Sequence, residues 1–431
     1  MAVRVKRELN QSIAWLNPVC YSLAIMGAAS IDTIDGGTVT SPRGFRAGAT
    51  RAGIKQGAGD KLDLGILFSE TSCTAAALFT SNRIKSAPII LCQKRLKKGS
   101  AVAIIANSGC ANASTGERGL ADAAEMASLA AKSIGVNPED VLVASTGVIG
   151  QPLPMKLIKT GIDRIILSGD GGHELAQAIM TTDTVPKETA VSGRVDGTMF
   201  TIGGVAKGSG MIHPNLATMF CFLTTDAAVE PDFLKSALQK AVDISFNMIS
   251  VDGDTSPSDI VLILANGMTE NQPIAIGSQA AHVFQRALEQ VCIHLAKAIA
   301  RDGEGATRLI EVTVDGAAST AEARLAARTV VSSPLVKAAI HGADPNWGRV
   351  IAAVGRSGAE VVESKIDLSI GGIDLLKGGS PLPYDEKSVV RVFKRSEVPI
   401  SVHLNLGTAS ATAWGCDLSE EYVTINSQYM T

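Results

Sequence analysis

Residues 207–226 constrain the fold of this chain more than any other segment. A glycine-rich turn with a single lysine, Lys207-Gly-Ser-Gly, leads through Ala217-Thr218 into an apolar run from Met219 to Leu223. A short apolar run that follows turn residues is typical of a buried strand. The segment therefore predicts a glycine-rich loop that runs into a buried strand, with Thr218 held rigidly at its start.

Thr218 has two interpretations at this point. A β-branched residue is common at the start of a strand, so its role can be purely structural. Alternatively, cleavage of the Ala217-Thr218 bond would free an α-amino group with a pKa of about 7.7–8, which can take the proton of the hydroxyl and make it a nucleophile. In the uncut chain the same hydroxyl would attack the Ala217 carbonyl and form an ester that water opens.

The segment from Lys207 to Met219 resembles the self-processing site of the ornithine acetyltransferases, the glutamate N-acetyltransferases of arginine biosynthesis. The resemblance continues in order over roughly residues 35–431 and favours cleavage at Ala217-Thr218. The other matching segments are Gly44-Phe45-Arg46-Ala47, Ala75 to Arg83, Asn107-Ser108-Gly109, Ser145 to Gly150, Met180 to Thr184, Ser250 to Ser256, Asp302 to Thr307, Asp344 to Arg349 and Gly415 to Leu418.

The chain departs from the usual family pattern at two places. Cys110 follows Asn107-Ser-Gly where the family often has Asn, and Ser256-Pro257-Ser258-Asp259 stands in place of Ser-Thr-Asn-Asp. The acid spacing from Asp252 onward is loosely similar to a calcium loop, but the later bidentate Glu is missing. We therefore expect no metal here, and the departures affect local geometry rather than the catalytic positions.

Mixed helix and strand patterns predict an α/β protein with more than one layer. Helices are expected over 118–134, 232–249 and 282–301, and a hairpin over 189–204 with Asp196-Gly197 as its turn. Strands are expected over 101–106, 140–144, 260–265 and 310–314. The resemblance implies a layered mixed α/β body of the ornithine-acetyltransferase type, with a smaller C-terminal α/β subdomain at about 310–415.

The resemblance also implies a division of the chain. Residues 35–217 would form an α chain after self-cleavage, and residues 218–431 a β chain that includes the C-terminal subdomain. Residues 1–34 are expected to be an N-terminal extension. Its apolar patch, Leu23 to Ala29, is too short to span a membrane. A signal peptide or a targeting segment is the alternative to this plain N-terminal arm.

Composition excludes several other classes of protein. The chain has 39 Lys and Arg against 42 Asp and Glu, so its net charge of −3 provides no basic field for nucleic acid. Its seven cysteines form no CxxC pair and its six histidines have no metal-ligand spacing. With no nucleotide-binding glycine fingerprint and no cofactor lysine, we expect a cytoplasmic enzyme with reduced thiols and no bound cofactor or membrane partner.

Carried over residue by residue, the resemblance assigns roles to nine positions. Thr146 and Gly147, which otherwise read as an ordinary turn after a strand, would form the oxyanion hole, and Thr218 would be the nucleophile at the Ala217-Thr218 cleavage site. Lys207 is a plausible partner for a carboxylate and Glu304 for an ammonium group. The substrate-binding residues implied are Thr181 (with Thr182 not excluded), Lys207, Thr218, Glu304, Asn426 and Thr431.

The activity that the resemblance implies is a ping-pong acyl transfer. An acetyl group would pass from N2-acetyl-L-ornithine to Thr218 and then to L-glutamate, giving ornithine and N-acetylglutamate. The family includes enzymes that also use acetyl-coenzyme A, and no local motif separates the two kinds. Two α and two β pieces per assembly are implied. The alternatives are a self-processed amidase or aminopeptidase, and a non-catalytic amino-acid-binding protein.

Overall fold

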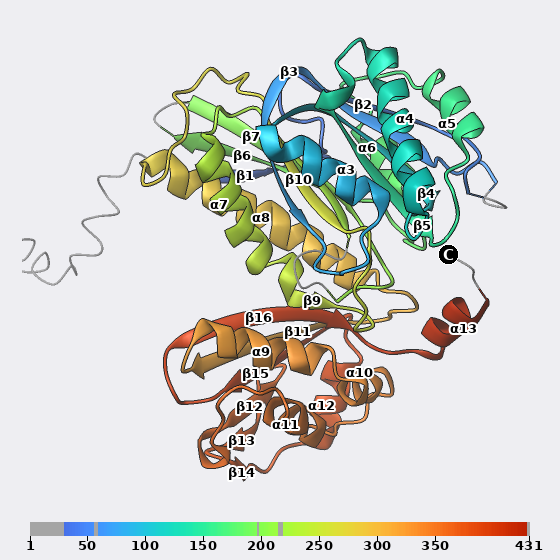
Figure 1. The fold of residues 1–431 in the computed structure, drawn as a ribbon. Coiled ribbons are helices and arrows are strands. Elements are labelled where there is room, and N and C mark those ends of the chain that lie inside the picture. Colours follow the sequence, from blue (N-terminus) through green and yellow to red (C-terminus); the bar gives the residue numbers. More distant parts are fainter. Residues whose placement is uncertain (1–29, 56–58, 196–197, 214–218, 429–431) are drawn as a thin grey trace, which may run out of the picture.

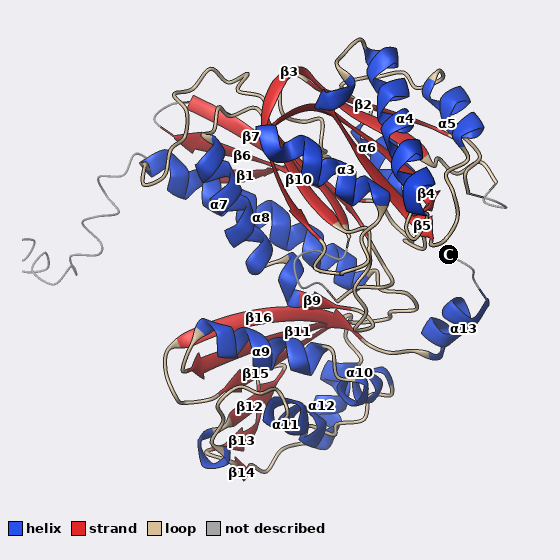
Figure 2. Cartoon of the chain, viewed as in Figure 1, coloured by secondary structure: helices blue, strands red, loops and turns tan. Residues whose placement is uncertain are grey.

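The computed structural model describes residues 30–55, 59–195, 198–213 and 219–428. Figure 1 shows a larger body and a smaller lobe built from the C-terminal part of the chain. Each contains a sheet flanked by helices, as Figure 2 shows. The fold class is therefore α/β, as the sequence predicts. No helix in the described part of the chain is long and apolar enough to cross a membrane.

The larger sheet has nine strands among the described residues, in the order β1-β6-β7-β8-β10-β3-β4-β5, with β2 also paired to β3. They are β1 (Ile31–Ile34), β2 (Phe45–Thr50), β3 (Leu64–Phe79), β4 (Ser100–Cys110), β5 (Val141–Val148), β6 (Lys187–Val195), β7 (Thr198–Lys207), β8 (Phe220–Thr225) and β10 (Ile260–Ala265). Every residue of β8 and β10 is buried, because these parallel neighbours lie in the middle of the sheet.

The long strand β3 joins two halves of this sheet. Residues 74–79 pair with β10, whereas residues 64–68 pair with β4, and the register shifts between Phe68 and Cys73. Side chains from both halves meet in one buried cluster, in which Phe222 and Leu262 from one half join Leu142 from the other. This shared cluster brings the end of β5 close to the end of β7.

Six helices are described in the body. They are α3 (Ala87–Arg95), α4 (Gly116–Ile134), α5 (Met155–Ile162), α6 (Gly172–Ile179), α7 (Pro231–Asp243) and α8 (Gln279–Arg301). The predicted helix at 118–134 is confirmed, and Gly135 ends it in the left-handed conformation at φ 74°. The predicted helix at 282–301 is also confirmed and begins earlier, because the Ser278 side chain accepts a hydrogen bond from the Ala281 N–H.

The smaller lobe has a seven-stranded sheet, in the order β14-β13-β12-β15-β11-β16-β9 over the described residues. Its strands are β9 (Ile249–Ser250), β11 (Leu309–Ala317), β12 (Asp367–Ile370), β13 (Ile373–Lys377), β14 (Ser380–Pro381), β15 (Glu397–His403) and β16 (Ala409–Cys416). Its helices are α9 (Thr320–Val331), α10 (Pro334–His341), α11 (Gly348–Gly355) and α12 (Glu386–Phe393). One apolar cluster runs from α7 and α8 into this lobe, so the two parts share a core.

The remaining helix, α13 (Glu420–Gln428), follows β16 and runs from the smaller lobe back towards the body (Figure 1). It carries no buried residue, so it is attached through polar contacts rather than through a core face.

Two local predictions differ from the structure. The helix expected over 232–249 ends at Asp243, and Phe246–Met248 form a 3-10 turn that leads into β9. Residues 145–148 belong to β5 rather than following it, because they pair in register with residues 107–110 of β4. The hairpin is confirmed in its two arms, which pair from Lys187 with Ala206 to Val195 with Thr198; its predicted turn, 196–197, lies outside the described residues.

Candidate active site

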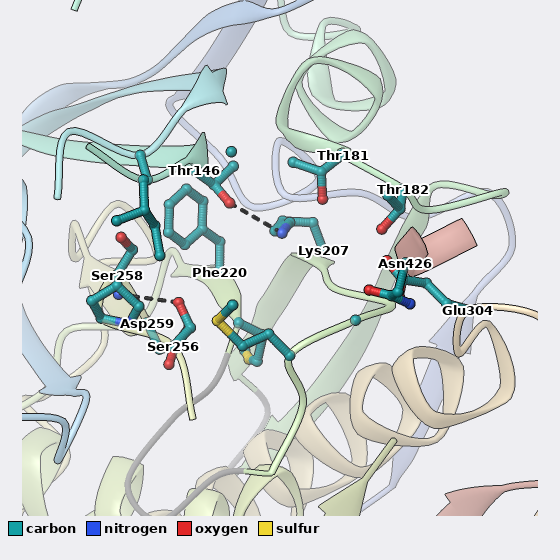
Figure 3. A pocket seen from close by; sticks show the side chains of 17 residues that line it. Thr146, Thr181, Thr182, Lys207, Phe220, Ser256, Ser258, Asp259, Glu304 and Asn426 are labelled. Atoms are coloured by element: carbon teal, nitrogen blue, oxygen red, sulfur yellow. Dashed lines mark hydrogen bonds between the residues drawn. The ribbon is translucent and has the colours of Figure 1, made fainter. Parts of the chain in front are cut away.

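A cavity of about 100 Å³ lies at the edge of the larger sheet, where β5 and β7 end and β8 and β10 begin. Figure 3 shows Lys207 in the middle of the view, with Glu304 and Asn426 on one side and Ser258 and Asp259 on the other. The described residues that line the cavity are Ala111, Thr146, Gly147, Ile149, Thr181, Thr182, Lys207, Gly210, Met211, Met219, Phe220, Ser256, Pro257, Ser258, Asp259, Glu304 and Asn426.

Thr146 and Gly147 reach the cavity from the end of β5. Gly147 has a φ of 126°, and a Cβ atom at this position would lie 2.4 Å from the carbonyl carbon of Gly109 on β4. Only glycine fits this close approach of two strands. Lys207 Nζ donates a hydrogen bond to Thr146 Oγ1 at 3.2 Å. Because the lysine uses the oxygen as an acceptor, the Thr146 proton is left for another partner.

Lys207 is the last residue of β7 and is buried. Its Nζ lies 5.9 Å from the centre of the Phe220 ring, a cation–π geometry across the β7–β8 pair. Burial lowers the pKa of this lysine, and the carboxyl groups of Asp183 and Asp259 act in the opposite direction. The ammonium therefore lies in a desolvated position where an incoming carboxylate would be a strong partner.

A buried ionic network lies behind Lys207. Lys187 Nζ is 2.6 Å from both Asp183 Oδ1 and Asp302 Oδ2. Asp183 also accepts hydrogen bonds from Gly208 N–H at 2.6 Å and Thr181 N–H at 2.9 Å. Burial raises the pKa of Asp183, but Lys187 and Lys207 outweigh this effect and hold the pKa at about 2. A single ionised carboxylate therefore fixes the backbone at two places around the cavity.

The two neighbouring threonines at the cavity, Thr181 and Thr182, differ in the hydrogen bonding of their hydroxyl groups. Thr182 Oγ1 lies 2.6 Å from the Ser209 hydroxyl, so it is already used within the protein. The Thr181 hydroxyl makes no hydrogen bond to any described residue. This difference favours Thr181 over Thr182 as the side chain available to a substrate.

Glu304 follows the C-terminus of α8 and is buried. Its backbone N–H donates to Ser209 O at 2.9 Å, and its Oε2 accepts from Asn426 Nδ2 at 2.7 Å. A Cβ atom on Gly210 would lie 2.5 Å from this carboxylate, so a larger residue there would displace the Glu304 side chain from its position. The Asn426 contact connects α13 to the cavity.

Asp259 and Ser258 line the cavity just before β10 and have no assigned role in the sequence analysis. Asp259 Oδ2 and Ser258 Oγ are buried and have no hydrogen-bond partner among the described residues. Burial raises the pKa of Asp259 well above its ordinary value, against the opposing effect of a hydrogen bond from Ser256 and the charge of Lys207. Burial therefore disfavours the ionised form of this carboxyl group, although it lies close enough to Lys207 for their charges to interact.

Six of the predicted site residues thus line one cavity: Thr146, Gly147, Thr181, Lys207, Glu304 and Asn426. Three others, Ala217, Thr218 and Thr431, lie outside the described residues. The residues that the sequence analysis did not assign are Asp183, Lys187, Asp302 and Asp259. The burial of these charges has no local signal in the sequence: Asp183 is four positions from Lys187, but Asp302 is 115 positions away. No group of metal-ligating side chains gathers within the described ranges.

The chain is similar to known proteins over most of its length. A family model described as the ArgJ family matches residues 46–431. The "Arginine biosynthesis bifunctional protein ArgJ" of Dehalococcoides mccartyi (strain CBDB1) is 53% identical over 403 residues, which covers 94% of this chain and 100% of that protein. The protein of the same name in Symbiobacterium thermophilum is 52% identical over 397 residues, covering 92% and 99%.

Two solved structures are also similar in sequence. ArgJ from Bacillus halodurans is 46% identical and covers 48% of this chain and 97% of that chain, with a TM-score of 0.47. Ornithine acetyltransferase complexed with ornithine from Mycobacterium tuberculosis is 40% identical and covers 44% and 100%, with a TM-score of 0.41.

Proposed function

Because this chain belongs to the ArgJ family, we propose that it transfers an acetyl group from N2-acetyl-L-ornithine to L-glutamate through an acetyl-Thr218 ester. The observation that carries the proposal is the convergence of six residues on one cavity beside Met219, the residue bonded to Thr218. They supply hydrogen-bond donors, an ammonium group and a carboxylate, which are the groups that an acylated amino acid requires.

The reaction has two matched halves. In the first, Thr218 Oγ attacks the acetyl carbon, the α-amino group of Thr218 takes the hydroxyl proton, and the C–N bond breaks as that proton passes to the leaving amine of ornithine. In the second, the amine of glutamate attacks the ester, and Thr218 Oγ leaves and recovers a proton. N-acetylglutamate is released.

Both halves pass through a tetrahedral oxyanion, which needs fixed donors. The Thr146 hydroxyl and the Gly147 N–H take this role, and Lys207 orients the hydroxyl by donating to its oxygen. Lys207 also holds the substrate carboxylate. Glu304 holds the ammonium group of ornithine, and Thr181, Asn426 and Thr431 complete the substrate site.

Self-cleavage at Ala217-Thr218 generates the nucleophile. It gives an α chain of residues 35–217, with the extension 1–34 before it, and a β chain of residues 218–431 that includes the C-terminal subdomain at about 310–415. Two α and two β chains form the assembly, which is cytoplasmic. Acetyl-coenzyme A is the second acetyl donor that we propose.

The test is an assay of acetyl transfer with the purified protein. We expect ornithine and N-acetylglutamate in equal amounts from N-acetylornithine plus glutamate, and no turnover by Thr218→Ala. Release of acetate without glutamate would identify an amidase and contradict the transferase proposal. Tight ornithine binding by a chain that stays whole and releases no acetyl group would identify a binding protein. Replacing the donor by acetyl-coenzyme A tests the second activity.

A further inference from the structure

A second hollow, of about 510 Å³, lies behind the loop that borders the catalytic cavity. Thr255 lines this hollow, whereas the next residues, Ser256 to Asp259, line the catalytic cavity. One wall is a face of α9 in the smaller lobe, and the other wall comes from loops of the body. The α9 groove is lined by Ser81, Asn82, His213, Thr255, Ala321, Arg324, Leu325, Arg328, Thr329 and Ser332.

The groove is positively charged. Arg324 and Arg328 lie one helical turn apart on the same face of α9, and like charges at this spacing repel each other. No carboxylate is present among the described residues that line the groove. Burial and the charge of Arg328 lower the pKa of His213, and the exposed Asp254, which follows in the chain just before Thr255, acts in the opposite direction. Two arginine side chains therefore line one hollow whose other described lining residues carry no acidic group.

The donors that the groove offers to an oxyanion are mainly those of its two arginines. Arg324 makes no hydrogen bond or ion pair with any described residue. Arg328 is half-buried, and its Nη2 lies 3.2 Å from His213 Nε2, which holds the guanidinium in place. Three of the four hydroxyls in the walls, those of Thr255, Thr329 and Ser332, already donate to backbone carbonyl oxygens. The guanidinium groups are therefore the donors on which anion binding depends, and arginine forks are groups that proteins use to bind phosphate.

The walls are also held in place without a ligand. Thr255 Oγ1 donates to His213 O at 2.8 Å, and Asn82 Nδ2 donates to Thr255 O at 2.9 Å. On the opposite wall, the other face of α9 packs on β11 and β16 through residues such as Ala327 and Val330.

The volume of the groove falls in the range of small-molecule sites, which is about 300–1,000 Å³. The apolar lining is limited to Ala321 and Leu325, so a hydrophobic ligand has little to contact.

From this arrangement we propose that the α9 groove binds a phosphate-bearing small molecule, separately from the catalytic cavity. The recognised chemistry is a phosphate or diphosphate group held by Arg324 and Arg328. The proposal does not depend on the acetyl-transfer reaction, because none of the groove residues has a role in that reaction.

The test is calorimetric titration of the purified full-length chain in phosphate-free buffer at low salt, with inorganic pyrophosphate and with adenosine 3′,5′-bisphosphate. We expect one site per chain, and Arg324→Gln should weaken the binding by about tenfold or more. Arg324→Lys, which keeps the charge but loses the planar fork, should weaken it less. Arg286→Gln removes the same charge from an exposed position on α8 outside the groove and should leave the affinity unchanged.

The two probes distinguish the sources of the phosphate. Equal affinity for both identifies a site for phosphate groups alone, and tighter binding of the bisphosphate identifies a nucleotide ligand; each result supports the groove. Absence of binding by both probes would overturn the proposal. An equal loss in Arg324→Gln and Arg286→Gln would also overturn it, because it would show a general charge effect rather than a site. Thermal melting of each variant checks that the fold is retained.

Discussion

At the scale of single residues, the Thr146 hydroxyl is the most directly testable group. Lys207 donates to its oxygen, so its proton is free to stabilise an oxyanion. Thr146→Val keeps the shape but removes the donor, and we expect kcat to fall about 10²–10³-fold with little change in KM. Thr146→Ser retains the hydroxyl and should recover most of the activity. A rise in KM with an unchanged kcat, measured by steady-state kinetics, would contradict the assigned role.

Two buried carboxyl groups near Lys207 should have opposite effects on stability. The pKa of Asp183 is held at about 2, below the unfolded value of about 3.9, so this group stabilises the fold above pH 4 and the contribution is lost as pH falls towards 2. The pKa of Asp259 is raised, so its unfolded form ionises first, and stability decreases as pH rises above about 4 until the folded group also ionises.

Asparagine variants separate these two cases. Asp183→Asn leaves Lys187 with Asp302 as its remaining carboxylate partner and should cost about 3–5 kcal/mol at pH 7. Asp259→Asn removes a group that resists ionisation and should be more stable than the wild type at pH 7, with a difference that shrinks as pH falls to 4. Urea unfolding at several pH values measures both. Destabilisation by Asp259→Asn that is independent of pH would show that this carboxyl group is structural.

The sequence predicts such residues only in part. Lys207 and Thr146 could be assigned because a motif resemblance covers them, yet nothing near them indicates that one donates to the other. Lys187 and Asp302 looked like ordinary charged residues, because their pairing joins β6 to the end of α8 across 115 positions. Local sequence does not contain the burial that gives these groups their energetic importance.

At the scale of elements, α13 is the helix of the site that is held with the least burial. It buries no residue, and Asn426 connects it to Glu304 through one hydrogen bond of 2.7 Å. Asn426→Ala should therefore raise KM while changing stability by less than about 0.5 kcal/mol. Asn426→Asp should raise KM further, because it places a carboxylate beside Glu304.

The control for this helix is Val423→Ala, an exposed position on the same helix that is not among the described residues lining the cavity and should have no effect. Deletion of residues 426–431 should abolish activity and leave the melting temperature nearly unchanged. Full activity of that truncated chain would remove Asn426 and Thr431 from the substrate site.

Elements that depend on distant pairing were the ones that the sequence placed badly. The helical period of residues 232–244 continues in the side chains beyond Asp243, but Phe246 and Met248 are buried in a 3-10 turn. Ile249 then pairs with Trp414, 165 positions away, and this contact decides the local structure. By contrast, local periodicity predicts α4, α8 and the two arms of the β6–β7 hairpin, and the structure confirms them.

At the scale of the whole molecule, the proposed cut lies between two strands that pair with each other. β7 and β8 are antiparallel neighbours, from Lys207 with Phe220 to Ile202 with Thr225. On its other side β8 pairs with β10, and β10 pairs with β3. Strands of the N-terminal piece, β7 and β3, therefore enclose the β8–β10 pair of the C-terminal piece.

Cleavage should for this reason leave the two pieces in one folded unit. Separating them would expose four strand edges, on β7, β8, β10 and β3, and the buried faces of β8 and β10, so we expect the pieces to elute together under native conditions. Intact-mass measurement after denaturation should give pieces of 217 and 431 − 217 = 214 residues, the second beginning at Thr218. Thr218→Ala should give a single chain with the same native elution volume. A wild-type chain that stays whole would leave Thr218 without its general base, and fragments that part without denaturant would contradict the interleaved sheet.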